Sequence, residues 1–243
     1  MGEVVKIFAV SDVHGHCSLL KEALNAAGYD KENPRHLLVC CGDYFDRGNE
    51  NYEVLKFFEQ QKNCVKIKGN HEEMLKKLFD TGKMLPHHYI NGTHQTILDF
   101  FGKYAIDPEN GTVDFSGKTS MLDRVSEFID ETVNFFETEN YCFVHGWVPD
   151  SGSLSADWRS ANDEQWSKAR WVKWNEQYKH SAKPVNGKIL VCGHVPTLYA
   201  YTYDDKRTPD DSDIFYGDGI IAIDAGTFTS QRVNVLVVED KLI

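Results

Sequence analysis

The sequence has no long hydrophobic run and no excess of positive charge. No apolar stretch approaches the roughly 20 residues that a membrane-spanning helix needs. The first nine residues lack the cationic stretch and the longer apolar stretch of a signal peptide. Lys and Arg number 26 against 37 Asp and Glu, and the formal net charge of -11 argues against a broad nucleic-acid surface. We therefore expect a cytoplasmic protein without a membrane segment.

Paired cysteines are also missing. None of the six cysteines forms a CxxC pair, and most lie in apolar, strand-like runs where cysteine acts as a small hydrophobe. We expect reduced thiols. The GxSxG and GxxxxGK[ST] signatures are absent too, which argues against a serine hydrolase and a phosphate-loop protein.

The chain is long and apolar enough for one large α/β domain. It has 243 residues, of which 41% are hydrophobic. We predict a single domain over residues 1–243, with variable insertions near 81–118 and 147–187. The middle of the first insertion contains a predicted short helix over 94–101.

The first third alternates strand, loop and helix. Apolar, β-branched runs predict strands over 4–10, 36–41 and 64–67, and helical periodicity predicts helices over 18–27 and 51–61 and around Met74, Leu75 and Leu78. This order is typical of a mainly parallel sheet with helices outside. Further on, we expect helices over 120–137 and 161–178. Later strands are expected over 141–144, 188–192, 220–223 and 233–238, with the last two forming a hairpin.

Polar blocks follow five of these strands. They read Asp12-Val13-His14-Gly15, Gly42-Asp43-Tyr44-Phe45-Asp46-Arg47-Gly48, Gly69-Asn70-His71-Glu72, His145-Gly146 and Gly193-His194. Ligands of parallel sheets bind at the carboxyl ends of the strands, so we expect these blocks to converge in space.

The blocks resemble those of the calcineurin-like metallophosphoesterases, in particular the phosphoprotein phosphatases of bacteria and phages. GDYFDRG and GNHE match the family pattern intact, whereas the first block reads SDVHG, with Ser11 in place of Gly. The fourth block reads HGW, with Trp147 where larger relatives often have Gly. The resemblance extends from Asp12 to His194. It implies an α/β fold of the αββα sandwich type, with a dimetal site at the strand carboxyl ends.

The resemblance also implies a set of ligands for two divalent metal ions. Asp12, His14 and Asp43 would bind one ion, and Asp43, Asn70, His145 and His194 would bind the other, with Asp43 bridging. Carboxylate, imidazole and amide donors suit Mn²⁺, Fe²⁺ and Zn²⁺. The resemblance favours Mn²⁺, and Fe or Zn remain alternatives.

The implied reaction is direct attack on a phosphate ester by a hydroxide that bridges the two metals. In this reading His71 is the general acid for the leaving group, and Asp46 orients His71.

Arg47 and Arg170 would bind the phosphate oxygens by charge-assisted hydrogen bonds, and Asn70 would also contact substrate. Arg47 belongs to the long second block, whereas Arg170 lies on a predicted helix. A solvated helix face is an alternative for Arg170, and Arg159 competes for its role.

Three functions remain open at this point. The leading one is a serine/threonine protein phosphatase. The second applies the same chemistry to dinucleoside polyphosphates, nucleotides or cyclic phosphodiesters, since the blocks bind the phosphoryl group and not its substituent. The third, a non-catalytic scaffold, is disfavoured because His71 and Arg47 are present.

One further pattern is misleading. Residues 41–47 satisfy Cys-x5-Arg, the signature of cysteine-dependent phosphatases. Asp43 and Asp46 within that loop would repel both phosphate and a thiolate, so we reject this interpretation.

Overall fold

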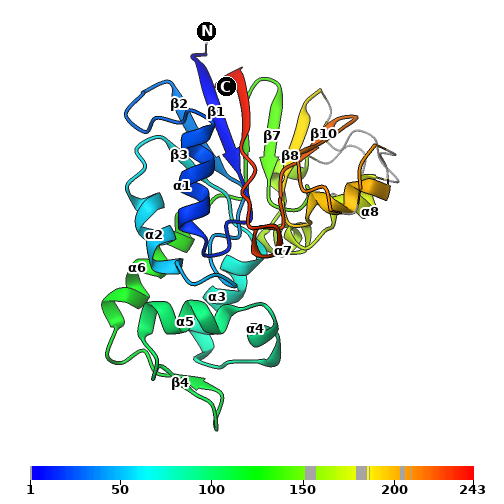
Figure 1. The fold of residues 1–243 in the computed structure, drawn as a ribbon. Coiled ribbons are helices and arrows are strands. Elements are labelled where there is room, and N and C mark those ends of the chain that lie inside the picture. The colour runs from blue at the N-terminus through cyan, green and yellow to red at the C-terminus, as the bar shows by residue number, and fades with distance from the viewer. Residues whose placement is uncertain (1, 151–156, 179–184, 186, 203–205, 209) are drawn as a thin grey trace.

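The protein is built from two central β-sheets with helices on their outer faces (Figure 1). We analysed a computed structural model, which describes residues 2–150, 157–178, 185, 187–202, 206–208 and 210–243. A small two-stranded sheet of β4 (Ile106–Asp107) and β5 (Thr112–Val113) lies apart from the two central ones.

The first central sheet contains the strands of the first third of the chain. Its order is β11 (Leu236–Lys241), β1 (Val4–Val10), β2 (His36–Cys40) and β3 (Cys64–Lys66). The pairs β1–β2 and β2–β3 are parallel, and β1–β11 is antiparallel. The predicted parallel arrangement is thus present, with the last strand of the chain added at one edge.

The second central sheet contains the later strands. Its order is β6 (Phe135–Glu137), β7 (Tyr141–Val144), β8 (Ile189–Cys192), β10 (Ile220–Ala222) and β9 (Phe215–Gly217). Here too the centre, β7–β8–β10, is parallel and both outer pairs are antiparallel.

The helices connect and cover the sheets. They are α1 (Cys17–Ala26), α2 (Asn51–Glu59), α3 (Asn70–Thr81), α4 (Pro86–Ile90), α5 (Thr93–Phe101), α6 (Thr119–Asp130), α7 (Asp163–Arg170), α8 (Trp174–Tyr178) and α9 (Thr227–Ser230), with 3₁₀ turns η1 (Trp158–Ser160) and η2 (Thr197–Thr202). None of the helices in the described ranges is long and apolar enough to cross a membrane.

Strand β1 shows why the sheets lie inside. Its side chains alternate between the helix-covered core, which receives Phe8 and Val10, and the core between the sheets, which receives Val5, Ile7 and Ala9. Both faces are therefore buried, and the strand is a continuous apolar run.

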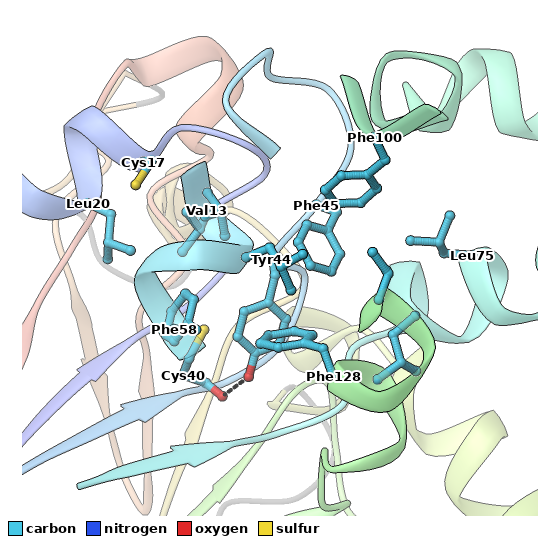
Figure 2. Packing of buried hydrophobic residues seen from close by; sticks show 14 of the residues in the cluster. Val13, Cys17, Leu20, Cys40, Tyr44, Phe45, Phe58, Leu75, Phe100 and Phe128 are labelled. Carbon is cyan, nitrogen blue, oxygen red and sulfur yellow. Dashed lines mark hydrogen bonds between the residues drawn. The ribbon is translucent and has the colours of Figure 1, made fainter. Parts of the chain in front are cut away.

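The core between the sheets also contains side chains of the second sheet, including Phe143, Val191 and Ile221. Separate clusters join the first sheet to α1, α2, α3, α5 and α6, and the second sheet to α7 and α8 (Figures 1 and 2). This four-layer arrangement confirms the predicted αββα sandwich.

Three sequence predictions about secondary structure were wrong. The helix predicted over 120–137 ends at Asp130, and 135–137 form the edge strand β6. The helix predicted over 161–178 is interrupted between α7 and α8. The strands predicted over 220–223 and 233–238 do not form a hairpin, because β10 and β11 belong to different sheets and β10 pairs with β9.

The cysteines lie as predicted. All six are free, and five are buried in the apolar clusters. The predicted insertion over 81–118 contains α4, α5 and the small sheet. Parts of the insertion predicted over 147–187 (151–156, 179–184 and 186) lie outside the described residues.

Candidate metal centre

The polar blocks are held in a strained backbone conformation. Seven non-glycine residues in the described ranges have positive φ angles, and six of them belong to the predicted site: Asp12 (52°), His14 (46°), Asp43 (57°), Asp46 (74°), Arg47 (67°) and His194 (69°). Such angles cost on the order of 1 kcal/mol or more each and persist only where the surroundings fix them. Their concentration here marks a functional site.

Close backbone contact between two loops requires glycine at position 42. Gly42 has a φ of 90°, and a Cβ atom on it would lie 2.7 Å from the backbone of Gly69 and 2.8 Å from the ring of His145. Only glycine lets the loops after β2 and β3 approach this closely.

Two aromatic side chains anchor the loop after β2. Tyr44 and Phe45 are buried, and Tyr44 packs edge-on against Phe58 and Phe128 at centroid distances of 4.9 and 5.1 Å (Figure 2). The two variable positions of the GDxxDRG block are therefore core residues here, and their burial holds Asp43 and Asp46 in place.

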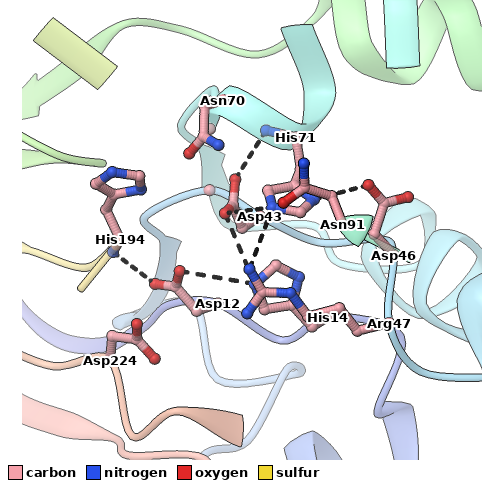
Figure 3. A network of polar contacts seen from close by, with 12 residues as sticks. Asp12, His14, Asp43, Asp46, Arg47, Asn70, His71, Asn91, His194 and Asp224 are labelled. Carbon is pink, nitrogen blue, oxygen red and sulfur yellow. Dashed lines mark hydrogen bonds and ion pairs between the residues drawn. The ribbon is translucent and has the colours of Figure 1, made fainter. Parts of the chain in front are cut away.

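The side chains of the blocks converge into two groups of donor atoms (Figure 3). His14, Asp43 and His71 form one group, and Asp43, His145 and His194 form the other; within each group the donor atoms lie within 4.8 Å of one another. Asp43 belongs to both groups, which is the geometry expected of a residue that bridges two cations.

The imidazoles of His14 and His145 are oriented for metal binding. The Nδ1 atoms lie 2.9 Å from the carbonyl oxygen of Phe45 and 2.7 Å from that of Cys41, respectively. These contacts turn the Nε2 atom of each ring toward the other donor atoms of the centre, where it can bind a cation. Nε2 of His145 lies 2.7 Å from Oδ1 of Asn70 and 3.4 Å from Oδ1 of Asp43, a spacing that suits ligands of one ion, each roughly 2.1 Å from it.

Burial keeps two of these histidines neutral. Burial, followed by the charges of His71 and Arg47, lowers the pKa of His14 well below its usual value. Burial likewise lowers the pKa of His194 to about 3. A neutral imidazole is the form that binds a metal, so the residues fit this role.

Asp12 connects the centre to the second sheet through His194, which follows β8. Its Oδ1 lies 3.9 Å from Nε2 of His14, and its Oδ2 accepts hydrogen bonds from the backbone N–H of His194, at 2.9 Å, and from the hydroxyl of Ser11. The serine that departs from the family pattern thus contacts a predicted ligand. Asp224 is buried nearby, and burial and the charge of Asp12 raise its pKa well above the usual value (Figure 3).

His71 and Asp46 form a buried pair. Nδ1 of His71 lies 2.7 Å from Oδ2 of Asp46, and its Nε2 lies 3.7 Å from Oδ2 of Asp43. Burial lowers the pKa of His71, but the charge of Asp43 and the hydrogen bond and charge of Asp46 raise it to about 9. The ring can therefore carry a proton.

Helix α5 holds Asp46, a contact that the sequence did not predict. Thr96 donates to Oδ1 at 2.6 Å and Thr93 donates to Oδ2 at 2.8 Å. Asn51 accepts the backbone N–H of Asp46 at 2.9 Å. Part of the insertion predicted over 81–118 therefore supports the His71–Asp46 pair, and no local pattern around Thr93 indicates this.

Glu72 is a second support that the sequence left without a role. Its carboxylate accepts the backbone N–H groups of Asp43, Tyr44 and Gly69, each at 2.9 Å. Burial and the charge of Asp43 raise its pKa to about 7. In the sequence, only its place as the last residue of the GNHE block could have indicated this role. A fully buried carboxylate needs hydrogen-bond donors of this kind.

The two predicted phosphate-binding arginines lie in different places. Arg47 is exposed, and its Nη2 lies 3.5 Å from Nε2 of His71, beside the centre (Figure 3). Arg170 is buried and bonds to Glu73 at 2.9 Å and to Asn134 at 2.7 Å. Glu73 lies about 200° around α3 from His71, so the structure does not bring Arg170 to the His71–Asp46 pair.

The competing candidate is not at the centre either. Arg159 pairs with Glu137 at 2.6 Å and with Asp157 at 3.0 Å. Trp147 of the fourth block packs with the second-sheet cluster, whereas the ring of Trp171 lies 6.1 Å from that of His194.

The structure also agrees with the rejection of a cysteine phosphatase. Cys41 is fully buried, and burial raises the pKa of its thiol well above the usual value. A nucleophilic cysteine requires the opposite shift.

Comparison with known proteins gives the family and the fold. The chain matches the calcineurin-like phosphoesterase family over residues 5–223. It is 37% identical over 76 residues to serine/threonine-protein phosphatase 2 of Escherichia coli K12, which is 31% of this chain and 34% of that protein's length. The match thus spans about a third of that relative.

Two solved structures share the fold at 12% identity and a TM-score of 0.60. One is of a candidate diadenosine tetraphosphatase, with 98% of this chain and 94% of that chain covered. The other is of a protein serine/threonine phosphatase from Saccharomyces cerevisiae, with 98% and 80% covered. With the family match extending over most of its length, this chain belongs to the calcineurin-like phosphoesterases.

Proposed function

We propose that the protein is a serine/threonine protein phosphatase that binds two divalent metal ions. The observation that carries this proposal is the pair of donor groups that share Asp43, beside the His71–Asp46 pair. Buried carboxylates next to neutral imidazoles are costly without a cation, so the donor set suits a metal centre. The relative in Escherichia coli supports the substrate class.

The residues divide into two ligand sets. Asp12, His14 and Asp43 would hold one ion, and Asp43, Asn70, His145 and His194 the other, which is how the family resemblance assigns them. His71 also lies within the first donor group. Because its Nδ1 is bonded to Asp46, we assign it proton transfer and not metal binding. Bound divalent ions would activate a water molecule and polarise the phosphoryl oxygens. Mn²⁺ is the proposed ion, and the donors also suit iron or zinc.

The side chains of the chain itself supply the remaining chemistry. His71 holds a proton at Nε2, which can pass to the leaving alkoxide of a phosphoserine or phosphothreonine. Asp46 fixes the ring through Nδ1, and the two threonines of α5 fix Asp46 in turn. Arg47 is exposed beside His71, so its guanidinium can bind phosphate oxygens from the solvent side.

The test compares substrates on the metal-loaded protein. A phosphoserine peptide and diadenosine tetraphosphate should be supplied at equal concentration, and release of phosphate or nucleotide measured for the wild type and His71→Asn. We expect the peptide to be hydrolysed faster, with chelator abolishing turnover of either substrate. Preferred hydrolysis of the dinucleotide would replace the protein-phosphatase proposal with the small-molecule alternative.

A further inference from the structure

An apolar groove lies beside α3. It has a volume of about 670 Å³ and is lined by residues of α3, by residues of the segment 85–91, which includes α4, and by Trp171. Most of the surface that lines it is apolar, and its largest apolar side chains are Met74, Leu85 and Trp171. Its size and character are typical of sites that bind ligands through apolar contacts.

Two of these apolar side chains are open to solvent. Leu85 is 48% exposed and Trp171 is 47% exposed. Large apolar side chains that line one groove gain free energy when a ligand removes them from water. Contiguous exposed apolar surface of this kind marks an interaction site more often than a single exposed side chain does.

The groove adjoins the metal centre at two places. Met74 lies one helical turn along α3 from His71, the proposed general acid. The ring of Trp171 lies 6.1 Å from that of His194, a predicted ligand. A helical turn rises about 5.4 Å and an extended residue spans about 3.5 Å, so a peptide with its phosphate at the metal centre would reach the groove within roughly one to three residues.

The charge of the lining indicates what kind of group the groove binds. Of the described residues that line it, Lys77 is the only lysine or arginine, and it pairs with Glu73 at 2.6 Å. Burial and then the charge of His87 lower the pKa of His88 to about 4, so this ring is neutral near pH 7. The further phosphate groups of a dinucleoside polyphosphate would need cations, which the groove does not offer unpaired. The lining therefore favours an uncharged, apolar group.

We infer that this apolar groove binds an aliphatic or aromatic side chain of the protein substrate, located a few residues from the phosphorylated serine or threonine. The inference rests on the proposed function, because it requires a phosphopeptide at the metal centre. The side chain would cover Leu85 and Trp171, which are exposed in the free protein. This contact is separate from the bonds to phosphate, so it decides which phosphorylated sites are preferred and not whether the ester is cleaved.

The test measures kcat/KM of the Mn²⁺-loaded protein on a set of phosphoserine peptides. The reference peptide has only glycine and serine around the phosphoserine. Each other peptide carries one leucine, at one of the three positions before or the three positions after it. We expect leucine at one or more of these positions to raise kcat/KM by about tenfold or more, because its side chain becomes buried. Equal values for all the peptides would overturn the inference.

Variants of Leu85 assign the preference to the groove. Leu85→Ala should lower the ratio of kcat/KM between the best leucine peptide and the reference peptide by about threefold or more, whereas Leu85→Met keeps an apolar side chain and should keep the ratio. Ile90→Ala is the matched control, because Ile90 is an exposed residue of α4 that does not line the groove. A fraction of unfolded protein lowers both values equally and leaves the ratio unchanged. An unchanged ratio in Leu85→Ala would contradict the assignment to this groove.

Two further substrates separate failure of the inference from failure of the proposed function. Hydrolysis of p-nitrophenyl phosphate, which has no peptide, should be the same in the wild type and in Leu85→Ala. If diadenosine tetraphosphate were hydrolysed and none of the peptides were, the proposed function would be wrong, and the inference with it. If all the peptides were hydrolysed equally well, the proposed function would stand and only the inference would be wrong.

Discussion

Helix α3 separates two polar regions whose charges are balanced differently. The acidic region, on the side of His71, contains the buried carboxylates of Asp12, Asp43, Asp46 and Asp224. On the side of Glu73, the cations have carboxylate partners: Arg170 pairs with Glu73, and Lys76 pairs with Asp130. Buried charges of one sign are costly without partners, so the acidic region calls for cations, whereas the other region does not. Uncompensated buried charge thus distinguishes a metal centre from a cluster of ion pairs.

The largest effect should come from removing the shared carboxylate of the acidic region. Asp43→Asn weakens both donor groups, so we expect both metal ions to be lost and turnover to fall by about 10³-fold or more, since bound metals contribute several kcal/mol. Metal analysis after dialysis and hydrolysis of p-nitrophenyl phosphate measure this. If the variant kept two ions per chain, Asp43 would not be a bridge.

His71→Asn should separate proton transfer from metal binding. We expect kcat to fall by about 10²–10⁴-fold with metal content unchanged, because the ring is bonded to Asp46 and is the proposed general acid. His36→Asn is the control, since His36 begins β2, at the opposite end from the site. A variant that lost one metal ion would instead make His71 a ligand of the first donor group.

The support from α5 should have a smaller effect. Thr96→Val removes a donor to the buried carboxylate of Asp46, so we expect kcat to fall by about tenfold and the free energy of unfolding by roughly 1–3 kcal/mol. Thr112→Val, at an exposed position of the same insertion, should change neither quantity. If the two variants behaved alike in assays and melting curves, α5 would not support the His71–Asp46 pair.

The two arginines sharpen the contrast between the regions. Arg47→Met should lower kcat/KM by about 10- to 100-fold without changing the melting temperature. Arg170→Met leaves Glu73 without its buried partner, so we expect a loss of roughly 1–3 kcal/mol in stability. That is a fall in melting temperature of about 2–4 °C per kcal/mol for a chain of this size. A loss of kcat/KM at unchanged stability would restore the phosphate-binding role predicted for Arg170.

Secondary structure was predictable where the periodicity was local. The strands and helices of the first third lie close to the predicted ranges, because each apolar run ends at a polar loop. The pairing of the late strands was harder to predict, because β10 and β11 are similar apolar runs in the sequence but belong to different sheets. Pairing partners far apart in the chain, such as Val4 and Lys241, leave no trace in local periodicity.

The sequence by itself determined that polar blocks end five buried strands. The blocks after β1, β2 and β3 meet at one edge because these strands are parallel members of one sheet. Only the stacking of the second sheet on the first brings the blocks after β7 and β8 to the same place. Only the tertiary structure decided that Thr93 and Thr96 hold Asp46, about 50 residues away in sequence, and that Arg170 points to Glu73. The direction of a long side chain depends on which buried partner it finds, and that partner is fixed by how separate helices pack.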